Sequence, residues 1–163
     1  MKYYIIAGEA SGDLHGAELM KALLKCDSEA SFRIWGGEKM AAVGGQLVKD
    51  YRQTAVMGFV EVLRKAGTVR RNLDFCKSDI EAWKPDVVIL IDYPGFNLRI
   101  AEFAHGKGFK VFYYIAPKVW ATRERRVRKL RKYVDRLFVI FPFEPEYFRK
   151  HGIEAFYGGN PLA

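Results

Sequence analysis

The chain alternates between short apolar runs and longer segments in which apolar residues recur at helical spacing. Strands are predicted over Lys2–Ala7, Phe32–Trp35, Gln46–Lys49, Asp86–Ile91, Lys110–Ile115, Leu137–Phe141 and Glu154–Tyr157. Helices are predicted over Leu14–Leu24, Phe59–Leu63, Val69–Trp83, Asn97–His105, Thr122–Val134 and Glu144–His151, with a break near Gly67. Strands that are apolar throughout and alternate with helices are typical of a parallel sheet covered on both faces. The pattern therefore predicts an α/β fold with a doubly wound parallel sheet.

The composition fits one domain. With 163 residues, half of them hydrophobic, the chain can bury one ordinary core but not two. No apolar stretch approaches the roughly 20 residues of a membrane-spanning helix, and the N-terminus lacks the features of a secretory signal. We therefore expect a cytoplasmic location. Cys26 and Cys76 lack the close spacing of a metal site or redox pair, so packed, reduced thiols and no metal are expected.

Positive charge is concentrated between Lys118 and Arg136. This stretch holds nine Lys or Arg residues against two acids, within a net charge of +8 for the whole chain. Apolar Val127, Leu130 and Val134 recur at helical spacing, which predicts an amphipathic helix with its cations outward. Such a helix suits an anionic partner: a nucleic acid, a lipid surface or a phosphorylated small molecule. A solvated helix face with no partner is the alternative.

Ligands of doubly wound sheets bind at the carboxyl ends of the strands, which selects four loops: Gly8 to Asp13, Asp92 to Asn97, Ala116 to Thr122 and Pro142 to Glu144. The first two carry the candidate chemistry. The loop from Gly8 to Asp13 is neither a G-x-G-x-x-G nor a Walker A sequence, so a nicotinamide cofactor or ATP is not favoured. Ser11 or Asp13 could cap the helix that follows. Asp92 follows the most hydrophobic strand, which makes it the candidate general base. Alternatively, Asp92 only accepts backbone hydrogen bonds in its turn.

Five segments together resemble one enzyme family. They are AGEASGD at 7–13, VMGFVEVL at 56–63, KPDVVILIDYPGFN at 84–97, YYIAPKVWA at 113–121 and FPFEPEYF at 141–148. In this order they resemble the N-terminal half of the lipid-A-disaccharide synthases, over nearly the whole chain. The resemblance implies a Rossmann-like, acceptor-side domain of a GT-B glycosyltransferase in the lipopolysaccharide synthesis of Gram-negative bacteria. A second domain for the nucleotide sugar would lie outside this chain, which alone is expected to have little transferase activity.

The reaction that the resemblance implies is an inverting transfer of 2,3-diacylglucosamine. The donor is its UDP derivative, the acceptor is 2,3-diacylglucosamine 1-phosphate, and the products are UDP and the β(1→6) disaccharide, with no cofactor. Asp92 matches an aspartate of the family that is assigned an essential role. The substrate-binding residues implied are Gly8, Glu9, Ser11, Gly12, Asp13, Met57, Glu61, Asn97, Arg123 and Arg126. A peripheral contact with acyl chains and the inner-membrane surface is expected from Met57, Phe59, Val60, Val62 and Leu63. The alternative is that these apolar residues only pack on the sheet.

The chain departs from the family at Lys118, where many members carry a serine. Phosphate binding in that loop is therefore expected to differ in detail. Two other function classes stay open: another sugar-nucleotide enzyme, such as a nucleotide-sugar epimerase or a cell-wall N-acetylglucosaminyl transferase, and a non-enzymatic anion-binding domain. The chain has no recognised nucleic-acid motif, so no nucleic-acid partner is expected. Because removing a partner domain can uncover apolar surface, self-association into a homodimer is a further expectation.

Overall fold

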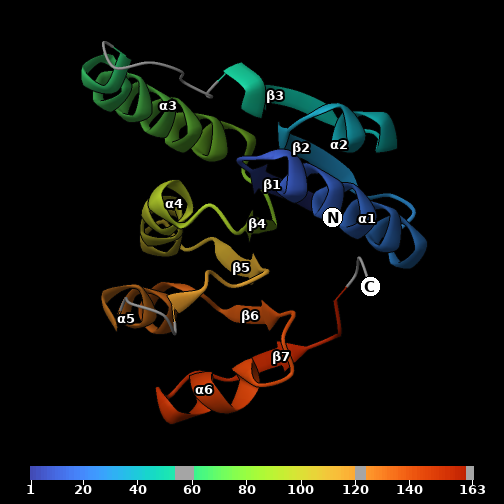
Figure 1. Cartoon of the computed structure of the whole chain (residues 1–163). Coiled ribbons are helices and arrows are strands. Elements are labelled where there is room, and N and C mark those ends of the chain that lie inside the picture. Colours follow the sequence, from blue (N-terminus) through green and yellow to red (C-terminus); the bar gives the residue numbers. More distant parts are fainter. Residues whose placement is uncertain (54–60, 120–123, 161–163) are drawn as a thin grey trace.

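A single parallel sheet forms the centre of the molecule (Figure 1). The computed structural model describes residues 1–53, 61–119 and 124–160, without the side chains of residues 61–65. Within these ranges the strands lie in the order β3-β2-β1-β4-β5-β6-β7. Their bounds are β1 Lys2–Ala7, β2 Ser31–Gly36, β3 Gln46–Asp50, β4 Val87–Ile91, β5 Lys110–Tyr114, β6 Arg136–Val139 and β7 Ala155–Tyr157. All neighbouring strands pair in parallel, which confirms the predicted sheet.

Helices cover both faces of the sheet, so the doubly wound α/β fold is confirmed. They are α1 Ala10–Cys26, α2 Glu38–Val43, α3 Glu61–Trp83, α4 Pro94–Gly106, α5 Glu124–Tyr133 and α6 Glu144–Lys150, with a short 3₁₀ helix at Tyr51–Gln53. Figure 1 shows α1 and α2 on one side of the strands and α3, α4 and α5 on the other. One buried cluster joins α1 and α2 to the sheet, and a second joins α3, α4, α5 and α6 to its opposite face.

Two local predictions were wrong, and one helix was missed. The helix predicted to break near Gly67 is continuous from Glu61 to Trp83, because one interior glycine costs only about 1 kcal/mol and packing outweighs it. Helix α2 was not predicted. Helix α1 begins at Ala10, and neither Ser11 nor Asp13 caps it, because its N-cap is Glu9 and no side chain bonds to the helix start.

A polar network fastens α3 to the first two strands. The Tyr4 hydroxyl accepts a hydrogen bond from Trp35 Nε1 at 2.8 Å and donates one to Asp79 at 2.8 Å. Arg33 donates two hydrogen bonds to the same carboxylate, from Nε at 2.6 Å and from Nη2 at 2.5 Å. Because these polar groups are hydrogen-bonded to one another, the network fixes the position of α3. The N-terminal half of α3 approaches the carboxyl edge of the sheet.

The two cysteines differ in their surroundings. Cys76 is buried on α3, where burial raises the pKa of its thiol to about 12. This agrees with a packed, unreactive thiol. Cys26 ends α1 and is exposed, so the prediction that both thiols are packed was wrong for Cys26.

Candidate functional site

The carboxyl ends of β4 and β5 carry strained backbone. Asp92 and Tyr93, directly after β4, have φ angles of 43° and 50°, and Ile115, directly after β5, has a φ of 65°. The two turns are joined, because the Asp92 N–H donates to the Ile115 carbonyl at 3.3 Å. Non-glycine residues rarely adopt left-handed angles, and a β-branched residue does so least readily. Strain of this kind clusters at functional sites, which marks this edge of the sheet as the candidate site.

Two buried side chains hold the Asp92 turn in place. The Tyr113 hydroxyl donates to the Asp92 carbonyl oxygen at 2.5 Å, and Asn97 Nδ2 donates to the same oxygen at 2.9 Å. The Asn97 amide also reaches the carbonyls of Ile91 and Ile6 at 3.3 and 3.4 Å, and thus ties β4 to β1. Asn97 is fully buried. Its contacts place it behind the site, in support of Asp92, and not on the surface that a ligand reaches.

The carboxylate of Asp92 lies in a mixed electrostatic field. Burial and the negative charge of Glu9 raise the pKa of Asp92, while the Tyr93 N–H and the cations Lys118 and Arg126 act in the opposite direction. The structure therefore places Glu9, Arg126 and Lys118 close enough to act on the charge of Asp92. Sequence reasoning had selected Glu9 and Arg126 as binding residues, and for Lys118 it had selected only the loop. The Asp92 carboxylate also accepts a backbone hydrogen bond, as the alternative interpretation required, but it stays partly exposed.

The first loop contributes a polar surface at the end of β1. Glu9 and Ser11 are exposed, and the Ser11 hydroxyl donates to the Glu9 carboxylate at 3.0 Å. Gly12 is buried beneath them, where a Cβ would lie 3.0 Å from that of Ala7. The loop can therefore present carboxylate and hydroxyl groups to a ligand beside Asp92.

Asp13 points away from this surface. Only 4% of it is exposed, and its carboxylate accepts hydrogen bonds from the backbone N–H groups of Gly37 at 2.8 Å, Met40 at 3.0 Å and Lys39 at 3.1 Å. Those amides form the first turn of α2. Asp13 thus starts a helix, but it is α2, which is distant in sequence, and not α1.

Position 8 has no room for a side chain, because the ring of Tyr93 lies against the backbone of Gly8. A Cβ at Gly8 would overlap that ring, whereas a Cβ at Gly95, near the start of α4, meets no atom within 4 Å. We expect Gly8→Ala to displace Tyr93 and to lower the free energy of unfolding by about 1–3 kcal/mol. Gly95→Ala is the matched control and should leave stability unchanged or slightly higher. Urea denaturation measures both, and an equal effect of the two substitutions would contradict this packing.

A small aromatic hollow lies behind Tyr93. It measures about 30 Å³, room for one water-sized group, and its walls include Trp35, Val69, Asn72, Tyr93 and Phe96. The rings of Tyr93 and Phe96 are stacked, with their centroids 5.6 Å apart, and the centroids of the Phe96 and Trp35 rings are 5.4 Å apart. Sequence reasoning missed this hollow, because its walls come from β2, α3 and α4. It connects the Asp92 turn to α3.

The side chains of several predicted site residues are not described by the structure. Met57, Phe59, Val60 and Arg123 fall outside the described residues, and for Glu61, Val62 and Leu63 only the helical backbone is described. Their roles stay predictions. Within residues 1–53, 61–119 and 124–160, no group of three or more His, Cys, Asp or Glu side chains is arranged to hold a metal ion.

Comparison with known sequences gives one consistent family. The family model described as lipid-A-disaccharide synthetase matches residues 3–163. The lipid-A-disaccharide synthase of Geobacter metallireducens is 46% identical over 159 residues, which are 98% of this chain and 41% of that protein. That of Koribacter versatilis is 40% identical and covers 99% of this chain and 43% of its own length. The chain thus spans about two fifths of the curated relatives that it matches.

Solved structures share the fold at low sequence identity. The UDP-GlcNAc 2-epimerase of Neisseria meningitidis, bound to UDP-GlcNAc, superposes with a TM-score of 0.70 at 13% identity, over 98% of this chain and 47% of that chain. The UDP-GlcNAc 2-epimerase of Methanocaldococcus jannaschii gives 0.66 at 17% identity, over 98% and 46%. At this identity the likeness concerns the fold alone.

Proposed function

Because the chain belongs to the lipid-A-disaccharide synthetase family, we propose that it is the acceptor-side part of a glycosyltransferase that makes the lipid A disaccharide. The acceptor is 2,3-diacylglucosamine 1-phosphate, and the donor is UDP-2,3-diacylglucosamine. The family match over residues 3–163 carries this proposal, and the strained Asp92 turn supplies the place for the chemistry. Measuring the binding of the acceptor and of UDP to this chain tests the proposal, which expects the acceptor to bind and UDP not to bind. A nucleotide-sugar epimerase shares only the fold.

Asp92 is the general base in this proposal. A β(1→6) linkage requires the 6-hydroxyl of the acceptor to attack the anomeric carbon of the donor. As the new C–O bond forms and the bond to UDP breaks, the Asp92 carboxylate takes the hydroxyl proton. The raised pKa makes this carboxylate a stronger base. The positive charges of Lys118 and Arg126 limit the rise of the pKa and so favour the ionised form that can accept a proton. Glu9 and Ser11 are placed to orient the sugar through hydrogen bonds.

The pH dependence of Asp92 follows from its surroundings. Its pKa lies above the ordinary 3.8 because of burial and Glu9, so activity should fall as the pH drops through this raised pKa. Between 3.8 and the raised pKa, the folded chain binds more protons than the unfolded chain, so this group adds stability as the pH falls. We expect Glu9→Gln to lower the pKa of Asp92. A carbon-detected NMR titration of the Asp92 carboxyl group measures this, with Glu18→Gln on α1 as the control; an unchanged pKa in Glu9→Gln would contradict it.

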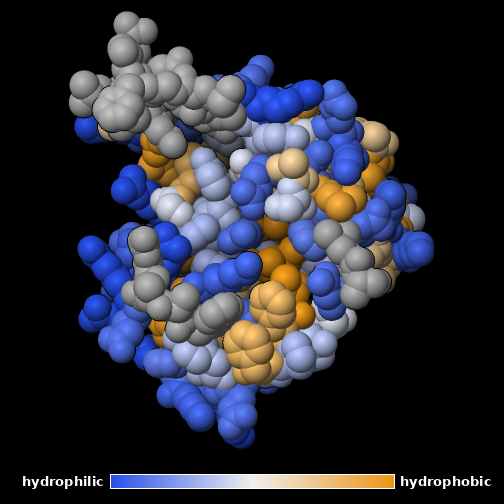
Figure 2. Space-filling model, in the orientation of Figure 1, coloured by the Kyte–Doolittle hydropathy of each residue, from blue (hydrophilic) through white to orange (hydrophobic). Residues whose placement is uncertain are grey.

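A peripheral membrane contact is the second part of the proposal. The helices on the α3 side of the sheet, α3 to α6, carry fourteen Lys or Arg residues against eight Asp or Glu residues, whereas α1 and α2 carry three of each. A groove of about 740 Å³ among α3, α4 and α5 has an excess of cations in its walls, because Arg70, Lys77, Arg99 and Lys129 line it together with only two acids, Asp74 and Glu102. Figure 2 shows a hydrophilic surface over α5. Such a face is attracted to anionic lipid head groups. No helix among the described residues could span a bilayer.

Vesicle binding tests which face meets the membrane. Arg128→Glu combined with Lys132→Glu, both exposed on α5, should weaken binding to vesicles with anionic lipid about tenfold or more. The control is Lys21→Glu combined with Lys25→Glu on α1, which makes the same change in charge on the opposite face. Co-sedimentation with vesicles of phosphatidylglycerol and phosphatidylethanolamine measures both. Equal losses in the two double variants would contradict the assignment of this face.

A further inference from the structure

We propose that Phe141, Phe143 and Lys118 form a subsite for the phosphorylated glucosamine ring, an inference that rests on the proposed function. In it, the two aromatic rings carry the apolar C–H face of the sugar and the lysine binds its phosphate. Lys118 and Phe143 lie in two of the strand-end loops predicted to bind ligands, but none of the three residues was named from the sequence as a binding residue. The subsite lies at the carboxyl ends of β5 and β6, next to the Asp92 turn.

The aromatic part of the subsite is a stacked pair of rings. Phe141 and Phe143 have ring centroids 5.7 Å apart and planes only 14° from parallel. Phe143 is 51% exposed, so part of the pair is accessible from solvent. The positive edge of each C–H bond on a sugar face is attracted to the negative face of an aromatic ring. A half-exposed phenylalanine with a second ring stacked against it offers such a face.

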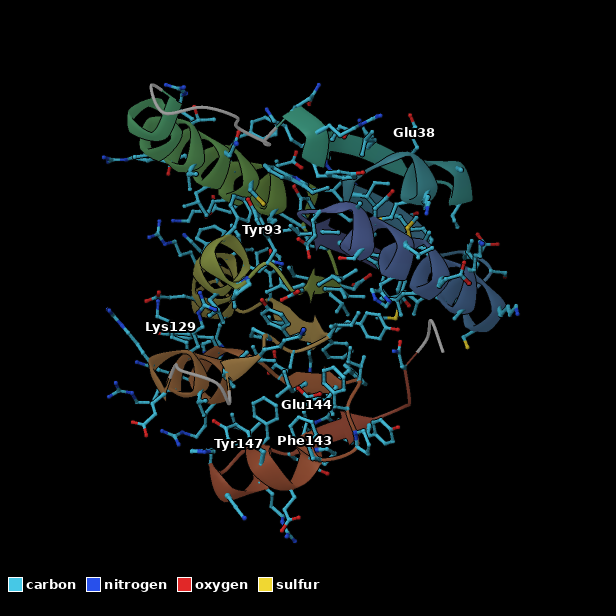
Figure 3. All side chains as sticks on the ribbon, viewed as in Figure 1. Glu38, Tyr93, Lys129, Phe143, Glu144 and Tyr147 are labelled. Carbon is cyan, nitrogen blue, oxygen red and sulfur yellow. The ribbon has the colours of Figure 1, made fainter. Side chains whose placement is uncertain are left out.

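The loop that carries the rings is held rigidly. Glu144 is 1% exposed, and its carboxylate accepts hydrogen bonds from the N–H groups of Phe141 at 3.0 Å and Ile140 at 3.2 Å. In return, the Glu144 N–H donates to the Phe141 carbonyl at 3.2 Å. Figure 3 shows Glu144 and Phe143 side by side at the start of α6. A buried carboxylate therefore fixes the loop before any ligand arrives, so that little ordering is needed on binding.

Lys118 connects the rings to the Asp92 turn. Its Nζ lies 6.0 Å from the centroid of the Phe141 ring, and its positive charge acts on the Asp92 carboxylate. β5 lies between β4 and β6, and parallel strands are about 4.8 Å apart, so the loops after these three strands are neighbours. A sugar whose phosphate binds Lys118 and whose ring lies on Phe143 would thus have its hydroxyl groups near Asp92. The site thus combines the cation of Lys118, the aromatic face of Phe143 and the base Asp92.

A soluble probe separates this subsite from acyl-chain contacts. Glucosamine 1-phosphate has the sugar and the phosphate but no acyl chains, and NMR titration of the chain measures its dissociation constant while the spectrum reports folding. We expect Phe143→Ala to raise this constant roughly three- to tenfold, and Lys118→Met to raise it about tenfold. Phe143→Tyr should restore binding. With methyl glucosaminide, which has no phosphate, the effect of Phe143→Ala should persist and that of Lys118→Met should vanish.

Matched controls exist on other elements. Phe75 on α3 is also 51% exposed, and Lys107, after α4, has its Nζ 6.0 Å from the Phe103 ring. Phe75→Ala and Lys107→Met should leave binding of glucosamine 1-phosphate unchanged. Equal binding of this probe by the wild type, Phe143→Ala and Lys118→Met would overturn the subsite. If 2,3-diacylglucosamine 1-phosphate still binds in that case, the proposed function survives; if neither ligand binds the wild type, both proposals fail.

Discussion

Replacing Asp92 with asparagine is expected to lower the transfer rate of the complete transferase by a factor of about 10²–10⁴. Asparagine fills the same space but cannot take the proton of the attacking hydroxyl. The turn should keep its shape, because its hydrogen bonds from Tyr113 and Asn97 end on the backbone carbonyl and not on the carboxylate. We therefore expect kcat to fall while the KM for the acceptor changes little. Steady-state kinetics with both substrates measures this.

The control for this substitution is Asp74→Asn, an equal loss of charge at an exposed position on α3. It should leave kcat within about twofold of the wild type, since surface changes away from the site have small effects. A normal kcat with a raised KM in Asp92→Asn would show that Asp92 binds the acceptor without acting as the base.

Asp13→Ala should produce the largest loss of stability among single substitutions near the site. The change leaves three N–H groups at the start of α2 without an acceptor, and each buried unpaired donor costs about 1–3 kcal/mol. Because Lys39 is exposed and water can reach its amide, we expect a total loss of about 2–4 kcal/mol in the free energy of unfolding. Urea denaturation with linear extrapolation measures it.

Glu18→Ala serves as the control, because Glu18 lies on the same helix and makes only an exposed ion pair with Lys21. Its expected effect is within about 0.5 kcal/mol. If Asp13→Ala cost no more than Glu18→Ala, the carboxylate would not be holding α2 in solution.

The strands and the position of Asp92 could be predicted because the signals are local. A parallel strand buried on both faces is a continuous apolar run, such as Val87–Ile91, and the residue after it must lie at the carboxyl edge. Helix α3 was less accessible, since the penalty at Gly67 is visible in sequence but the packing that outweighs it is not. The short helix α2 depends on Asp13, twenty-four residues before Gly37, so no local pattern could reveal it.

Which residues come together in the site was likewise only partly predictable, because they are distant in sequence. Lys118 lies twenty-six residues after Asp92, and only the order of β4 and β5 in the sheet places the two together. Asn97 was selected as a substrate contact because the family resemblance implies it. Its burial and its three backbone partners, on β1, on β4 and in the Asp92 turn, are visible only in three dimensions. The aromatic hollow behind Tyr93 is likewise assembled from separate elements.

The central claim is that this chain holds the acceptor, and calorimetry with two ligands tests it most directly. The ligands are 2,3-diacylglucosamine 1-phosphate, kept below its aggregation limit, and UDP, each titrated into the wild type and into Asp92→Asn. We predict saturable binding of the lipid by both proteins and no binding of UDP. Tight binding of UDP without binding of the lipid would contradict the account, because it would place the donor, and not the acceptor, on this chain.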